Sequence, residues 1–258
     1  MSRSFTPGSV ELVVCERHRL IYRPLPKCAS TTVIDFIGDL VGHGDRGNRR
    51  DFLPFVAADV SPGRGDAYAV KCPTAALPGF MERYAGYLWF SVVRDPYARL
   101  KSNYFNKLNR YARQFEPMIY LLAYVRQTLA GRVAWRPGHE VDRAACMQAS
   151  IPFPRFVSGL REHGISWDPH FASQADLLQT DVIPYHRLVR MEHLADGLRE
   201  VIADAGAIAA AAPALAGLKR LNRSSAATAD DAGVWTPAAR QIAADLYRRD
   251  FETLRYAA

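Results

Sequence analysis

The sequence lacks three features that would each point directly to a class of protein. It has only four cysteines in 258 residues, and none shows the C-x-x-C or Cys/His spacing of a zinc site. No stretch reaches the roughly 18 apolar residues of a membrane-spanning helix, and the N-terminal region has no apolar core of signal-peptide length. We therefore expect free thiols, no metal, and a cytoplasmic protein without an integral membrane segment.

Long runs of one charge are also missing. The 33 Lys and Arg residues exceed the 26 Asp and Glu residues, and the net charge of +7 favours anionic partners. The basic residues are scattered, with only short pairs such as Arg49-Arg50 and Arg248-Arg249, so we expect no nucleic-acid partner. The Arg-rich segments 46–50 and 132–143 would suit an acidic sugar or solvated surface, and we favour solvated surface.

The composition is that of a soluble globular protein, with 49% hydrophobic and 23% charged residues. The length fits a single α/β domain covering residues 1–258. Apolar runs at 11–15 and 20–22 predict a hairpin or two adjacent strands, and helical spacing follows the second run. The run at 87–93 predicts another strand before another helix. Two strand-to-helix units favour an α/β fold with a P-loop-like central parallel β-sheet flanked by helices.

The rest of the chain gives weaker signals. Residues 41–66 are rich in Gly, Arg, Asp and Pro and predict a long loop. In the segment 205–218, alanine content predicts a helix-rich connector broken at Pro213. Thr236 and Pro237 predict the N-cap and first position of a final helix. Further helices are predicted at 118–129, 142–147, 153–160 and 191–205.

The most informative segment is Pro-Lys-Cys-Ala-Ser-Thr-Thr at 26–32, between a predicted strand and a predicted helix. A helix N-terminus presents unpaired N–H groups and a partial positive charge, and small residues let a phosphate approach the backbone. A plainer interpretation makes Ser30 or Thr31 an ordinary N-cap and Lys27 a solvated side chain. The candidate phosphate-binding residues are Lys27, Cys28, Ala29, Ser30, Thr31 and Thr32.

A second segment, at 91–104, favours the phosphate interpretation. Arg94 ends the strand predicted at 87–93 and Ser102 follows two helical turns later, so both can reach one phosphate at the same sheet edge. Two such strand ends indicate a ligand with two phosphate-bearing arms. The Walker A motif of ATP and GTP hydrolases is absent, because Lys27 precedes the small residues instead of following them.

With these segments the sequence closely resembles the PAPS-dependent sulfotransferases, in particular the carbohydrate group called sulfotransferase family 2. Residues 26–32 match that family's P-K-x-x-x-T-T-like loop, and residues 94–104 match its R-D-P-[FY]-x-R-L-x-S-x-[FY] segment. Residues 167–174 resemble its D-x-H-[WF]-x-P-Q stretch, with Ser173 in place of the usual proline. Weaker similarity continues at 221–224 and 247–251.

The resemblance implies direct, metal-free transfer of a sulfuryl group from PAPS (3′-phosphoadenosine 5′-phosphosulfate) to a hydroxyl of a carbohydrate or glycoconjugate acceptor, with PAP as product. Lys27 would stabilise charge on the leaving oxygen, and the loop around it would hold the 5′-phosphosulfate. Arg94 and Ser102 would bind the 3′-phosphate, with Arg223 as a further contact. Cys28 would be a small filler and not a nucleophile.

The acceptor hydroxyl needs a general base, and His170 is the first candidate. A packed histidine beside Trp167 and Phe171 is the competing interpretation. His43 is the second candidate, and a carboxylate is a third. Two other functions remain as alternatives, a P-loop-like nucleotide kinase and a non-enzymatic polyanion-binding protein. The acceptor's identity and the oligomeric state do not follow from the sequence.

Overall fold

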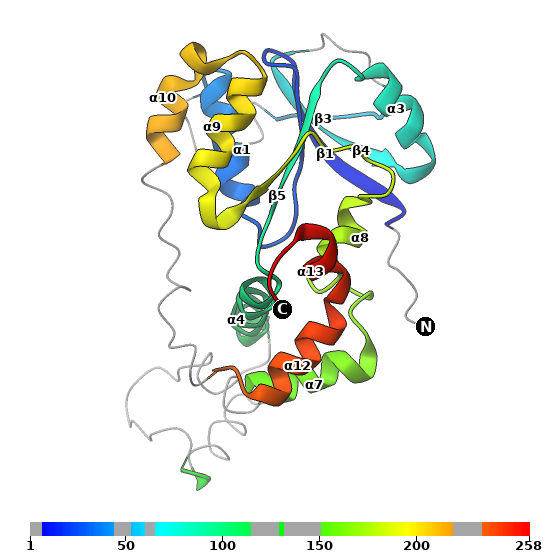
Figure 1. Cartoon of the computed structure of the whole chain (residues 1–258), viewed down its shortest axis with the longest axis vertical. Coiled ribbons are helices and arrows are strands. Elements are labelled where there is room, and N and C mark those ends of the chain that lie inside the picture. Colours follow the sequence, from blue (N-terminus) through cyan, green and yellow to red (C-terminus); the bar gives the residue numbers. More distant parts are fainter. Residues whose placement is uncertain (1–6, 44–52, 60–64, 115–128, 132–150, 219–233) are drawn as a thin grey trace.

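The chain folds around a mixed six-stranded sheet flanked by helices (Figure 1). The computed structural model describes residues 7–43, 53–59, 65–114, 129–131, 151–218 and 234–258. The strands lie in the order β3-β4-β1-β2-β5-β6. Their bounds are β1 Ser9–Cys15, β2 Leu20–Arg23, β3 Phe55–Val56, β4 Ala67–Pro73, β5 Leu88–Val93 and β6 Arg187–Arg190.

The sheet is dominated by parallel pairs but is not wholly parallel, which corrects the prediction. β2 pairs with β5, β5 with β6 and β3 with β4 in parallel, whereas β1 is antiparallel to both β2 and β4. The reason is local, because only the four residues 16–19 connect β1 to β2. A connection this short can close only an antiparallel hairpin, since a parallel crossover needs a dozen residues or more.

Helices cover the two faces of the sheet unequally (Figure 1). On one face lie α1 (Ser30–Leu40), α9 (Leu194–Asp204) and α10 (Ile208–Leu218), and on the other lies α3 (Leu77–Arg83). Alternate side chains of β1 serve both faces: Val13 packs in the core that contains α1, and Leu12 in the core that contains α3. A short 3-10 turn, Thr74–Ala76, precedes α3, and another, Met191–His193, precedes α9.

A third core holds the helices drawn below the sheet in Figure 1. It joins aromatic and aliphatic residues of α4, α7, α12 and α13. The ring centre of Tyr104, for example, lies within about 5.3 Å of three other aromatic ring centres. Tyr247 is part of this core, and Arg99 is also buried. The four helices are α4 (Pro96–Gln114), α7 (Phe153–His163), α12 (Pro237–Leu246) and α13 (Arg248–Leu254), whereas α8 (Gln174–Leu178) packs in the core that contains α1.

Two predicted elements differ in the structure. The segment around Pro213 is one helix, α10, and is not broken there, because its buried residues Ala211, Ala214 and Leu218 hold both halves against the core. The predicted final helix is two helices, since Tyr247 leaves helical geometry at φ −108° and ψ 21°. Its start is confirmed: the Thr236 hydroxyl accepts a hydrogen bond from Ala239 N–H at 3.2 Å.

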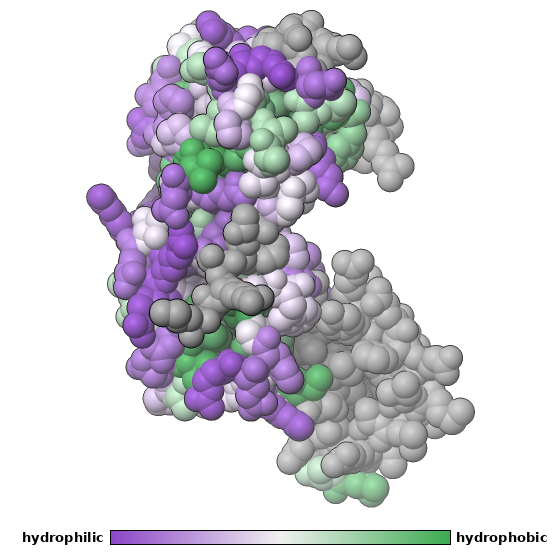
Figure 2. Space-filling view, turned by 90° about the vertical axis from the view of Figure 1, so that its right-hand side faces the viewer, coloured by the Kyte–Doolittle hydropathy of each residue, from purple (hydrophilic) through white to green (hydrophobic). Residues whose placement is uncertain are grey.

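Other predictions fall partly or wholly beyond the described residues. These are the helix at 142–147, almost all of the helix at 118–129, the segments 46–50, 132–143 and 221–224, and Arg223. Within the described residues, no helix combines the length and apolarity that crossing a bilayer requires. Figure 2 shows a mostly hydrophilic described surface on the face turned to the viewer, with apolar residues in small separate patches.

Candidate active site

Three parallel strands end side by side at one edge of the sheet. Arg23 of β2 pairs with Ser91 of β5, and Val93 of β5 pairs with Arg190 of β6. The chain leaves β2 for α1 through residues 24–29 and leaves β5 for α4 through Arg94 and Asp95. The two predicted phosphate-binding segments are therefore neighbours at the carboxyl ends of adjacent parallel strands, where α/β folds bind ligands.

The turn before α1 has the backbone geometry of an anion-binding site. Ala29 is the N-cap of α1, with φ 57°, and no side chain caps the helix. Lys27 also has a positive φ, 66°. Left-handed residues beside a helix start turn successive N–H groups toward one point, and the first three helical N–H groups have no partner within the helix. Because Ala29 is the N-cap, neither Ser30 nor Thr31 is an ordinary N-cap.

One predicted contact in this turn is altered. The Cys28 N–H donates to the Leu25 carbonyl at 3.4 Å, so it closes the turn instead of facing a ligand. The hydroxyl-bearing residues that follow lie in the first turn of α1, with Thr31 exposed and Ser30 and Thr32 half-buried. The donors for an anion are therefore the first N–H groups of α1 and these hydroxyls.

Arg94 connects the second strand end to this turn. Its Nη1 donates to the Lys27 carbonyl at 3.3 Å. Burial lowers the pKa of the Arg94 guanidinium, although an arginine stays charged at physiological pH. Asp95 caps α4, because its Oδ1 accepts a hydrogen bond from Ala98 N–H at 2.8 Å, and burial raises the pKa of its carboxyl. The two segments are thus in direct contact.

A pocket of about 520 Å³ opens beside the start of α4. Arg94 and Ser102 both line it, as predicted for one phosphate, together with Lys101. Arg240 of α12 adds another cation, and its guanidinium lies 4.6 Å from the ring centre of Tyr97. The lining residues are Arg94, Asp95, Tyr97, Ala98, Lys101, Ser102, Trp235, Arg240, Ala257 and Ala258.

His170 forms a pair with Asp168. Both its main-chain N–H and its ring Nδ1 lie 2.8 Å from Asp168 Oδ1. An ionised carboxylate can only accept, so in a neutral imidazole paired this way Nδ1 carries the proton and Nε2 is the proton acceptor. The His170 side chain is one-third exposed. His43, the second candidate base, follows the far end of α1, and a helix of 11 residues is about 16 Å long. His43 therefore lies about the length of α1 away from the turn that precedes this helix.

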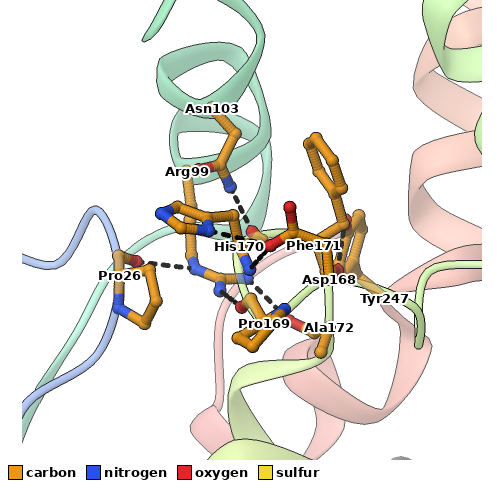
Figure 3. Close-up of polar contacts among 9 residues, drawn as sticks. All are labelled: Pro26, Arg99, Asn103, Asp168, Pro169, His170, Phe171, Ala172 and Tyr247. Carbon is orange, nitrogen blue, oxygen red and sulfur yellow. Dashed lines mark hydrogen bonds and ion pairs between the residues drawn. The ribbon is translucent and has the colours of Figure 1, made fainter. Parts of the chain in front are cut away.

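Arg99 links the segment that carries His170 to the turn before α1 (Figure 3). It is only 2% exposed, and its guanidinium donates to three backbone carbonyls. These are Pro26 O at 3.2 Å, Ala172 O at 2.9 Å and Pro169 O at 3.2 Å. Asn103, one turn later on α4, donates to the His170 carbonyl. α4 therefore holds the segment that carries His170 beside the turn that precedes α1.

The model of the sulfotransferase family (Sulfotransfer_2) matches residues 10–257. The chain belongs to this family. No curated protein and no solved structure gives a significant match, so the assignment rests on the family model. The protein is therefore a transferase that moves a sulfuryl group to a hydroxyl-bearing acceptor.

Some residues of this region received no role from the sequence. Arg99 and Asp250 fall inside matched motifs and Arg240 lies in none, and their roles were missed because their partners are distant in the chain. Gln174 was noticed only as part of a motif. Ser173, which departs from the usual proline, has a structural reason: its hydroxyl donates to Asp250 at 2.5 Å and accepts from Asp176 N–H at 3.3 Å, which a proline could not do. In the described part of the chain, no three His, Cys, Asp or Glu side chains gather as metal ligands.

Cys28 is placed to be inert. It is fully buried, and burial raises the pKa of its thiol to about 11. Only about one such thiol in a thousand is ionised near pH 8, and only the thiolate is a good nucleophile. We expect iodoacetamide to leave Cys28 unmodified in the folded sulfotransferase and to modify it after denaturation, as read by peptide mass spectrometry. Rapid labelling of Cys28 in the folded protein would contradict this environment.

Proposed function

We propose that this sulfotransferase transfers the sulfuryl group of PAPS to a hydroxyl of a carbohydrate or glycoconjugate acceptor in the cytoplasm. The observation that carries the proposal is the junction of two anion sites, with Arg94 bonded to the Lys27 carbonyl. PAPS has two phosphate-bearing arms on one ribose, and the two strand ends offer one site for each. The resemblance to the carbohydrate group supports the acceptor class, and the mostly hydrophilic surface in Figure 2 suits a polar acceptor.

The residues present fit such a donor. The uncapped start of α1 would bind the 5′-phosphosulfate in a P-loop-like manner, using N–H groups and the hydroxyls of residues 30–32. The pocket beside α4 would bind the 3′-phosphate, since Arg94, Lys101 and Arg240 supply positive charge around it. Trp235 adds an aromatic wall against which a base can pack.

The chain's own groups would then act in two ways. Lys27 would stabilise the negative charge that builds on the oxygen leaving the sulfur, as electrostatic stabilisation is the main protein contribution to such transfers. His170 Nε2 would accept the proton of the acceptor hydroxyl while the hydroxyl oxygen forms the bond to sulfur. Asp168, bonded to Nδ1, would hold the imidazole in the required tautomer and stabilise its charged form.

Calorimetric titration with PAP beside ATP tests the donor class. We expect PAP to bind far more tightly than ATP, because only PAP places a phosphate in the pocket lined by Arg94 and Ser102. A screen of carbohydrates with PAPS, read as the mass gain of one sulfuryl group, tests the acceptor class. Equal binding of PAP and ATP would contradict the donor, and sulfation restricted to acceptors without sugar would contradict the acceptor.

Removing the Arg94 side chain should weaken the donor site. We expect Arg94→Ala to lower PAP affinity about ten- to a hundredfold, because a hydrogen bond to a charged group is worth about 1.5–3 kcal/mol. Titration calorimetry measures the change. Arg248→Ala is the control, since Arg248 is exposed and pairs with Asp245 on the surface. An Arg94→Ala variant that binds PAP as tightly as the Arg248→Ala variant would exclude Arg94 from the site.

A further inference from the structure

The side chain of Gln174 lies between the two anion sites. It is fully buried, at 0% exposed. Its Nε2 donates to the Arg94 carbonyl at 2.8 Å, and its Oε1 accepts from the Arg94 N–H at 2.9 Å. The same oxygen accepts from the Cys28 thiol at 3.2 Å. One amide thus bonds the residue that follows β5 and the turn that leads into α1.

The backbone of Gln174 is fixed from a third direction. Asp250 of α13, also 0% exposed, accepts from Gln174 N–H at 2.9 Å and from Ala175 N–H at 2.9 Å. The Ser173 hydroxyl donates to the same carboxylate. The start of α8 is therefore anchored, and Gln174 cannot simply follow one site if that site moves. A rigid link between the two anion sites is the result.

We propose that Gln174 is a positioning residue that sets the spacing between the 5′- and 3′-phosphate subsites, and thereby selects nucleotides that carry both groups. The inference rests on the proposed function. When one arm of a ligand is bound, the second arm meets its site at a high effective concentration only if the spacing is right. A site that is already at the correct spacing also avoids the free-energy cost of ordering it.

The bonds of Gln174 distinguish positioning from direct binding. They engage the Arg94 main chain and the Cys28 thiol. The hydrogen-bond donors to the phosphates would instead be the Arg94 guanidinium and the first N–H groups of α1. Loss of the Gln174 amide leaves each donor set intact and loosens only their relative placement. Ligands with one phosphate should hardly respond, and ligands with two should bind less tightly.

The test compares PAP with adenosine 5′-monophosphate and adenosine 3′-monophosphate by calorimetry on the full chain. For Gln174→Met and Gln174→Asn, we expect PAP affinity to fall about tenfold and that of each monophosphate less than about twofold. Gln179→Met is the matched control at the other end of α8, because the buried Gln179 amide has no hydrogen-bond partner among the described residues. It should keep the wild-type ratio of affinities.

The outcomes separate the two proposals. A wild-type protein without preference for PAP over both monophosphates would overturn the proposed donor and this inference with it. A normal wild-type preference that the Gln174 variants retain, or an equal loss for all three ligands, would overturn the positioning role alone. If neither variant folds, Cys28→Ala removes one of the three bonds and should lower the ratio roughly two- to threefold. An unchanged ratio there would also overturn the role.

Discussion

Lys27→Ala should reduce sulfuryl transfer about a hundred- to a thousandfold while the protein stays folded, the usual effect of removing one charge-stabilising group from an active site. Lys27 lies in the turn before α1 and is only half-buried, so truncating its side chain removes less buried surface than truncating a core residue would. The reduction should fall on turnover, because charge on the leaving oxygen develops in the transition state and not in the bound donor.

The measurement is the initial rate of acceptor sulfation at saturating PAPS, with circular dichroism as a check on folding. Lys71→Ala is the matched control, since Lys71 is exposed on β4, which is separated from β2 by β1. Its activity should equal that of the wild type. Full activity in folded Lys27→Ala would remove this lysine from the mechanism.

Arg99→Met should destabilise the fold by about 2–4 kcal/mol, because a buried polar group that loses its partner costs about 1–3 kcal/mol and Arg99 serves three carbonyls. Arg99→Lys should have an intermediate effect, as one ammonium cannot reach all three oxygens in the geometry of the guanidinium. The free energy of unfolding, from urea denaturation, measures the loss.

Arg187→Met is the control for Arg99. Arg187 pairs with Glu200 and Asp204 on the surface, and exposed ion pairs contribute less than about 1 kcal/mol. Equal destabilisation by the two substitutions would show that the Arg99 network adds nothing beyond an ordinary surface arginine. Weaker PAP binding should accompany Arg99→Met, because the Pro26 carbonyl, in the turn before α1, loses its hydrogen-bond donor.

Local signals predicted the parts of the site that lie close together in the chain. The small residues after Lys27, and Arg94 with Pro96 at the end of a strand-like run, specify strand-turn-helix units through short-range preferences. The sequence also predicted β1 and β2 as a hairpin or two adjacent strands, and the structure has the hairpin. Its consequence for the sheet was not predicted, because an antiparallel hairpin inside an α/β chain makes the sheet mixed.

Elements and contacts that depend on distant partners escaped prediction. The sequence did not predict β4 or β6 as strands. Tyr68 and Val70 are buried in β4, but the partner strand of β4, β1, lies more than 50 residues away in the chain. From the sequence, Arg99 looks like one more basic residue on a helix. Only the structure shows that it bonds the carbonyls of Pro169 and Ala172. For the same reason Gln174 was visible only as part of a motif.

The carboxylate of Asp250 has a consequence for the order in which the protein matures. A nascent chain leaves the ribosome from its N-terminus, so the turn before α1 and Gln174 emerge well before Asp250 does. Until α13 is synthesised, the N–H groups of Gln174 and Ala175 lack their acceptor. Binding of the proposed nucleotide should therefore require that α13 has been synthesised and packed against α8.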